Sequence, residues 1–78
     1  MGSSSSAKDH LKFEIEFLQK QIKWLERDNR ENVKVKIANA KDKHAKDYYK
    51  NQLEANKRQI QAYKDQIAYK RMCLKNYK

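Results

Sequence analysis

The chain has 78 residues, of which 38% are apolar and 37% are charged, and its formal net charge is +9. A chain this short and this polar buries too small a share of its surface for a compact monomeric core. One glycine and no proline leave little to divide it into strands and tight turns. We therefore expect an all-α protein, built from a long amphipathic helix of the coiled-coil type.

The N-terminal residues 1–6 are rich in serine and predict a flexible leader, either native or left by cloning. They also fit the N-myristoylation pattern, because removal of Met1 would expose Gly2 and a serine stands at the sixth position. Gly2 is thus a candidate lipidation site. A myristoyl chain alone binds membranes marginally, so a basic surface would have to supply the second signal.

Residues 7–31 are predicted to form the first helical segment. Ser6 and Asp9 have the spacing of a capping box, and apolar residues follow at intervals of three and four. The resulting stripe consists of Leu11, Ile15, Leu18, Ile22 and Leu25. Trp24 lies beside this stripe and is predicted to be an interface anchor, since tryptophan often dominates binding energy.

Residues 32–46 form a polar section or bend, in which the leucine row continues through Asn32, Asn39 and Lys46. Two architectures remain open. The first is a near-continuous rod, which at ~70 residues would extend about 105 Å. The second is a two-helix antiparallel hairpin that turns near residues 28–34. The absence of internal glycine and proline, together with the unbroken phase of the row, favours the rod.

Residues 47–78 are predicted to form a basic heptad helix. Its apolar seam is expected to face partner helices and consists of Tyr49, Leu53, Asn56, Ile60, Tyr63, Ile67 and Leu74. Asn56 is the polar member of this seam. A single polar residue in a core row commonly fixes the register of paired helices, which is the role we expect for Asn56.

Basic residues recur at seven-residue intervals and make up a predicted anion-facing stripe. Its members are Lys36, Lys43, Lys50, Lys57, Lys64, Arg71 and Lys78. On one continuous helix they would place a charge roughly every 10 Å. The row on the other side of the seam is neutral: Ala45, Gln52, Gln59, Gln66 and Cys73. Neither a parallel nor an antiparallel homodimer neutralises the stripe through such rows, whereas an external anionic surface does.

No catalytic residue, metal site or cofactor is predicted. His10 and His44 lie far apart in the sequence, with no cysteine or histidine at a metal-ligand spacing from either. Cys73 is the single cysteine and cannot form an internal disulfide, so we expect an intracellular setting, in the cytoplasm or an organelle interior. No apolar run approaches the ~20 residues of a membrane-spanning helix.

Together these patterns predict a non-enzymatic structural or scaffolding subunit. It would dock its apolar seam on partner helices, in a homo- or hetero-oligomer, and turn the basic stripe toward an acidic or otherwise anionic surface of a larger assembly. One alternative is an RNA-binding peripheral component of a ribonucleoprotein, with tyrosines stacked on bases between the lysines. The other alternative is a membrane-surface adaptor myristoylated at Gly2.

Overall fold

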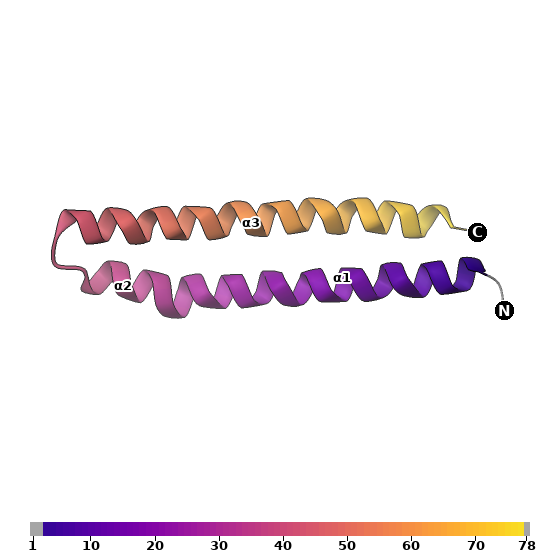
Figure 1. The fold of residues 1–78 in the computed structure, drawn as a ribbon, viewed down its shortest axis with the longest axis horizontal. Coiled ribbons are helices and arrows are strands. Elements are labelled where there is room, and N and C mark those ends of the chain that lie inside the picture. Colours follow the sequence, from indigo (N-terminus) through magenta and orange to yellow (C-terminus); the bar gives the residue numbers. More distant parts are fainter. Residues whose placement is uncertain (1–2, 78) are drawn as a thin grey trace.

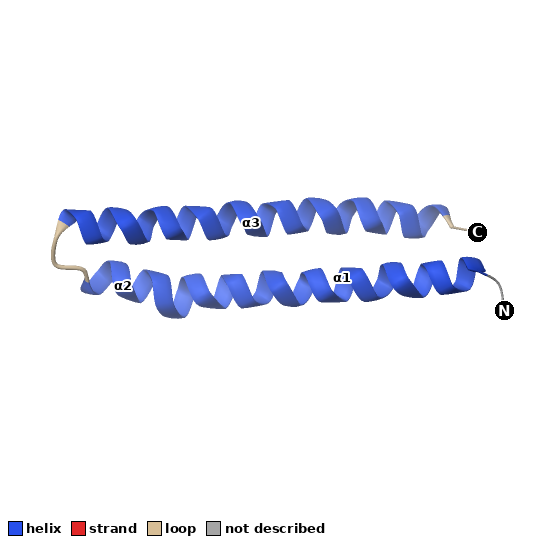
Figure 2. Cartoon of the chain, viewed as in Figure 1, coloured by secondary structure: helices blue, strands red, loops and turns tan. Residues whose placement is uncertain are grey.

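The computed structural model describes residues 3–77, with side chains for residues 7–77. Two antiparallel helical arms lie side by side in a molecule of 60 × 16 × 12 Å (Figure 1). The elements follow in the order α1 (Ser3–Asp28), the π-helix η1 (Asn29–Val33), α2 (Lys34–Asn39) and α3 (Lys43–Asn76). The described residues contain helices and short loops but no strand (Figure 2). The all-α prediction is confirmed.

The chain reverses direction at residues 40–42, and this corrects the expectation of a near-continuous rod. The turn also lies later than the 28–34 expected for the hairpin. Ala40 and Asp42 both adopt extended backbone, with ψ of 131° and 164°. Asp42 then caps α3, because its Oδ1 accepts a hydrogen bond of 2.7 Å from the backbone N–H of Ala45. Ordinary residues and a side-chain cap therefore make a turn that needs neither glycine nor proline.

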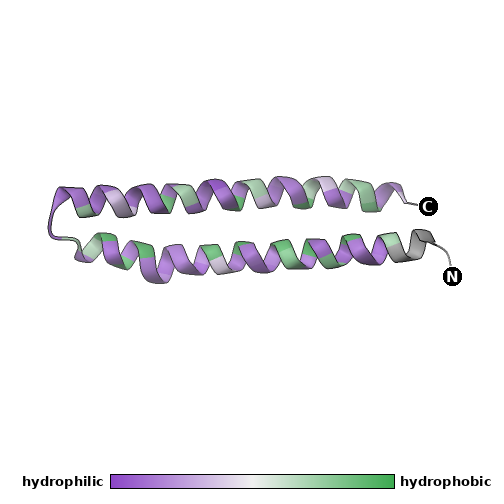
Figure 3. Cartoon of the chain, in the orientation of Figure 1, coloured by the Kyte–Doolittle hydropathy of each residue, from purple (hydrophilic) through white to green (hydrophobic). Residues whose placement is uncertain are grey.

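Folding back lets the apolar rows of the two arms bury each other. The buried cluster consists of Ile15, Leu18 and Ile22 from α1 with Ile60 and Ile67 from α3. Apolar positions accordingly recur along the inner edge of the first arm (Figure 3). Full burial of one aliphatic side chain contributes about 1.5–3 kcal/mol. The hairpin gains most of this at the five positions of the buried cluster and less at the half-buried ones, whereas an isolated rod would leave both rows in water.

Residues 29–33, within the range where a turn was expected, form η1 instead. The seam there advances by four residues at each step, from Leu25 to Asn29, Val33 and Ile37. An α-helix has about 3.6 residues per turn, so side chains spaced four residues apart shift progressively around its surface and would leave the seam. The wider turn of a π-helix absorbs the extra residue. As a result Asn29 and Val33, which are 7% and 5% exposed, both return to the seam.

A polar contact crosses the seam at the level of η1. Asn56 Nδ2 donates to Asn29 Oδ1 at 2.8 Å and to Asp28 Oδ2 at 3.2 Å. Asn56 Oδ1 in turn accepts a hydrogen bond from Gln52 Nε2 at 3.3 Å. Because Asn56 and Asn29 are both 7% exposed, each is satisfied only when the arms keep this alignment. This is the geometry expected of a residue that fixes helix register.

Three sequence predictions concern the ends of the chain. Helix α1 begins at Ser3, so helical backbone starts before the capping box expected at Ser6 and Asp9. Gly2, the candidate lipidation site, lies outside the described residues. Lys78, the last member of the predicted basic stripe, lies outside them as well.

Candidate interaction surfaces

The hairpin exposes more surface than a compact protein of its mass. Its accessible surface is 6389 Å², whereas a compact monomer of 9.4 kDa exposes about 5,000 Å². The radius of gyration is 17.6 Å, against about 11.5 Å for a compact chain of this length. Two helices shield only one side of each other, so the outer sides are where a binding surface has to be sought.

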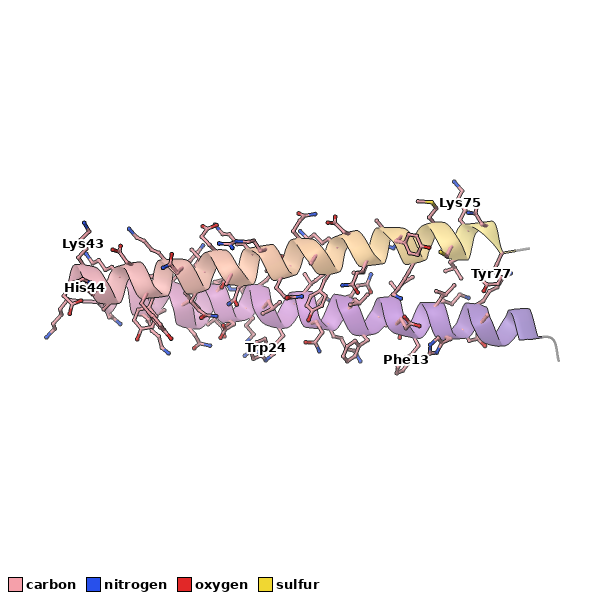
Figure 4. The ribbon with its side chains drawn as sticks, turned by 45° about the horizontal axis from the view of Figure 1, so that its top comes forward. Phe13, Trp24, Lys43, His44, Lys75 and Tyr77 are labelled. Carbon is pink, nitrogen blue, oxygen red and sulfur yellow. The ribbon has the colours of Figure 1, made fainter. Side chains whose placement is uncertain are left out.

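The structure divides the interface residues predicted from the sequence into two groups. Those buried or half-buried along the seam are Leu11, Ile15, Leu18, Ile22, Leu25, Tyr49, Leu53, Asn56, Ile60, Tyr63, Ile67 and Leu74. Trp24 is the exception, because it is 63% exposed and points away from α3 (Figure 4). The two halves of the predicted seam thus face each other within one chain, and Trp24 is left for another contact.

The turn also divides the predicted basic stripe. Five of its members lie on α3 and are exposed: Lys43, Lys50, Lys57, Lys64 and Arg71. Lys36 lies on α2, in the other arm, where its Nζ is 5.7 Å from the ring centroid of Tyr49. At this distance the ammonium group is attracted to the ring face. The stripe is therefore a line along one side of α3 rather than along the whole chain.

Part of this line borders a groove of about 420 Å³ between the arms, which we call the basic groove. Lys57 and Lys64 lie on its α3 side, and Arg30 and Lys34 lie on the side of the first arm. Glu26 is the single carboxylate among the described residues that line it. Four cations around one acid give the groove an excess of positive charge, which favours an anionic occupant.

Two apolar residues of the seam also line the basic groove. Leu53 is half-buried and Ile60 is 8% exposed, and both belong to the row that packs between the arms. The groove therefore combines an apolar base with cationic edges. Sequence periodicity identified Lys57 and Lys64 but missed Arg30 and Lys34, because only the fold-back brings η1 and α2 beside this part of α3.

The opposite side of α3 carries no charge along two neighbouring rows. Besides the neutral row expected from the sequence, a second row consists of Tyr48, Ala55, Ala62, Tyr69 and Asn76, again at seven-residue intervals. Each residue of the basic stripe follows a residue of the Leu53 row by four positions, and each residue of the neutral row precedes one by a single position. The basic stripe and the neutral row therefore lie on opposite sides of the seam. The seven-residue spacing of this second row is a signal that the sequence alone contains.

Aromatic residues of α1 adjoin this uncharged side. A second groove brings Phe17 together with Gln66, a member of the neutral row. Trp24 follows Phe17 by seven residues and so lies on the same side of α1. We define the aromatic face by its exposed members: Phe17, Trp24, Tyr48, Ala55, Ala62 and Tyr69. The hairpin thus has a basic side and an aromatic side, separated by the seam.

One ion pair joins the arms near their open end. Lys70 Nζ donates to Glu14 Oε2, and His10 Nε2 lies 2.7 Å from Glu14 Oε1. The hydrogen bond from Lys70 is the main cause of a lowered pKa for Glu14; burial opposes it, and the positive charges of Lys70 and His10 lower the pKa further by smaller amounts. Lys70 is the polar member of the α3 seam at this level, and Glu14 supplies its partner.

This pair predicts a pH-dependent stability difference. Because the pKa of Glu14 is lower in the folded state, its contribution is fully present above the unfolded value of about 4.3. The contribution is lost as the pH falls through the folded pKa. We expect Glu14→Gln to lower the urea midpoint at pH 7 more than the control Glu16→Gln, with the two variants converging once the pH falls below the folded pKa of Glu14. Equal midpoints at pH 7 would contradict the assignment.

Comparison of the chain with protein families, with curated proteins and with solved structures finds no match. None of the described helices combines the length and the apolar composition needed to cross a bilayer. Among the described residues no group of three or more histidine, cysteine, aspartate or glutamate side chains is placed to hold a metal ion. The interaction surfaces are therefore the features on which a functional proposal rests.

Proposed function

We propose that the hairpin is a non-enzymatic structural subunit of a larger intracellular assembly, and that its basic groove seats an acidic amphipathic helix of a partner protein. The observation that carries this proposal is the make-up of the groove. Lys57 and Lys64 face Arg30 and Lys34 across an apolar base. An amphipathic helix would place apolar side chains on that base and carboxylates beside the cations, as in other helix-in-groove complexes.

The same groove fits a phosphate backbone less well. Nucleic-acid phosphates would satisfy the cations but would leave the exposed part of the half-buried Leu53 without an apolar partner. Base stacking would need exposed tyrosines among the lysines. Instead Tyr49 and Tyr63 are half-buried in the seam, and Tyr48 and Tyr69 belong to the aromatic face on the other side. This arrangement favours a protein partner over RNA. The membrane-adaptor alternative depends on Gly2, outside the described residues.

The test is a binding titration with synthetic peptides, followed by fluorescence anisotropy. The probe is a labelled helix of leucine at heptad spacing with glutamate at flanking positions. A scrambled peptide of the same composition and a homopolymeric single-stranded RNA serve as comparisons. We expect the amphipathic peptide to bind most tightly, because only it matches both the charge and the apolar base. Tightest binding by RNA, with a steep loss of affinity in salt, would overturn the proposal in favour of nucleic acid.

Matched charge variants locate the binding site. Lys57→Gln with Lys64→Gln removes two cations from the groove, and we expect the peptide dissociation constant to rise about tenfold, since tenfold corresponds to ~1.4 kcal/mol. Lys20→Gln with Arg58→Gln removes the same net charge from exposed positions outside the groove. This control should change the dissociation constant much less. Equal losses in the two double variants would show non-specific attraction to the net charge of the chain.

A further inference from the structure

We propose that the aromatic face is a self-association surface, through which two copies of the chain form a symmetric antiparallel four-helix bundle. This inference is independent of the basic groove, which lies on the other side of the seam. Phe17, Trp24, Tyr48 and Tyr69 are 54–66% exposed there. Scattered exposed aromatics are normal, but here two aromatics of α1 lie beside two uncharged rows of α3 that carry small residues and two tyrosines.

The α1 and α3 residues of the aromatic face lie at matching levels along the hairpin. Glu14 lies level with Lys70 and Asn29 lies level with Asn56. Interpolation places Trp24 level with residues 60–61 and Phe17 level with residues 67–68. Suppose that a second copy is related to the first by a two-fold axis parallel to the helices. Rotation about this axis does not shift the copy along it, so the residues that are level within one hairpin are also level between the two copies. This arrangement would place α1 of one copy against α3 of the other, antiparallel to it.

In that arrangement large residues meet small or aromatic ones. Trp24 of one copy would lie over Ala62 of the other, and Phe17 would lie beside Tyr69. The residual offset is at most two residues, or about 3 Å along a helix. The spacing matches as well, since Phe17 and Trp24 are separated by seven residues and so are Ala62 and Tyr69. Each contact occurs twice, because a two-fold interface uses the same patch on both copies.

Charge and area both favour a second copy as the occupant. Each chain carries a net charge of +9, but the cation line of α3 would face outward from both sides of such a dimer. The α3 rows of the aromatic face hold no charged residue. The hairpin exposes roughly 1,400 Å² more than a compact monomer. A stable complex buries about 800 Å² on each partner, which this excess can supply.

The test is the mass of the full chain by sedimentation equilibrium under reducing conditions. We expect a reversible dimer of twice the 9.4 kDa chain, with Trp24 emission shifting to shorter wavelength as the dimer forms. Trp24 is the only tryptophan, so this signal reports on the proposed contact directly. A chain that stays monomeric while fully helical, or a dimer in which the emission does not shift, would overturn the proposal.

A size swap then tests the pairing of Trp24 with Ala62. Trp24→Ala is expected to raise the dimer dissociation constant roughly 30-fold, the scale of an interface hot spot. Ala62→Trp should also weaken the dimer, because two tryptophans would compete for one space. The double variant Trp24→Ala, Ala62→Trp should restore affinity, since the large and small positions are exchanged. The control Met72→Ala removes an exposed apolar side chain outside the aromatic face.

Both altered positions are exposed in the hairpin, so the variants should keep their helicity. Circular dichroism checks this for each one. Failure of the double variant to regain affinity, with helicity intact, would exclude the proposed pairing of α1 with α3 of the second copy. None of these substitutions touches the basic groove, so peptide binding there separates a failed dimer from a failed functional proposal.

Discussion

Replacing Ile60 with aspartate is expected to unfold the hairpin at neutral pH. Ile60 is 8% exposed and packs in the cluster that joins the two arms. A charged carboxylate there would lose its hydration without gaining a cation or a hydrogen-bond donor as a partner. Such a substitution is expected to lower the free energy of unfolding by more than about 4 kcal/mol. Domains are stable by about 0.05–0.15 kcal/mol per residue, so a chain of this size has roughly 4–12 kcal/mol to lose.

The measurement is helical circular dichroism with urea unfolding, against the control Asn51→Asp. Asn51 is exposed and lies outside the seam, the basic groove and the aromatic face, so the control adds the same charge on the outside. A graded variant, Ile60→Ala, should cost about 2–5 kcal/mol, because it removes buried methyl groups and leaves a cavity. Unchanged helicity and midpoint in Ile60→Asp would mean that the two arms do not pack along this seam.

The seam itself was predictable because it depends on a local pattern. Residues seven apart share one side of a helix whatever the rest of the chain does, so the row from Leu53 to Leu74 could be recognised from spacing alone. The Lys57 and Lys64 row followed from the same rule. Spacing does not show what an apolar face packs against. The sequence analysis therefore predicted a contact with other chains, whereas the two arms of one chain make this contact with each other.

The turn was misplaced because its signal is a single side chain. Asp42 is the last of three non-helical residues and caps α3, and the residues around it include no glycine or proline to mark the break. The polar residues at 28–32 looked like a better place to turn. In the structure those residues stay helical, because the π-helix keeps Asn29 and Val33 in the seam. Residues 28–32 stay helical because they pack against α3, and this contact between distant segments cannot be inferred from the local sequence.

The candidate surfaces show the same limit. Trp24 was predicted to be an interface anchor from its residue type, but its orientation outside the hairpin follows only once Ile22 and Leu25 are packed inside it. Arg30 and Lys34 join the basic groove because the chain folds back. The aromatic face similarly needs both arms, since Phe17 and Ala62 are 45 residues apart in the sequence. Surfaces shared between elements become visible only after the topology is known.

The second large effect is expected at the polar contact between Asn56 and Asn29. Asn56→Ala would leave the buried amide of Asn29 without its partner, at a cost of about 1–3 kcal/mol. Replacing both residues with leucine should instead raise the urea midpoint above that of the unaltered chain, because two apolar side chains would fill a site that now holds amides. A double-mutant cycle measures the coupling between the two positions.

The paired leucines should also loosen the alignment of the arms. An apolar seam tolerates sliding by a heptad, whereas the hydrogen bond from Asn56 to Asn29 is made at one register only. Spin labels placed at Lys12 and Lys75, with Cys73→Ser to remove the native thiol, report the distance between the arms. We expect one narrow distance in the chain with both asparagines and a broader distribution with both leucines. A narrow distance in both would mean that side-chain packing alone, with the short turn at 40–42, sets the register.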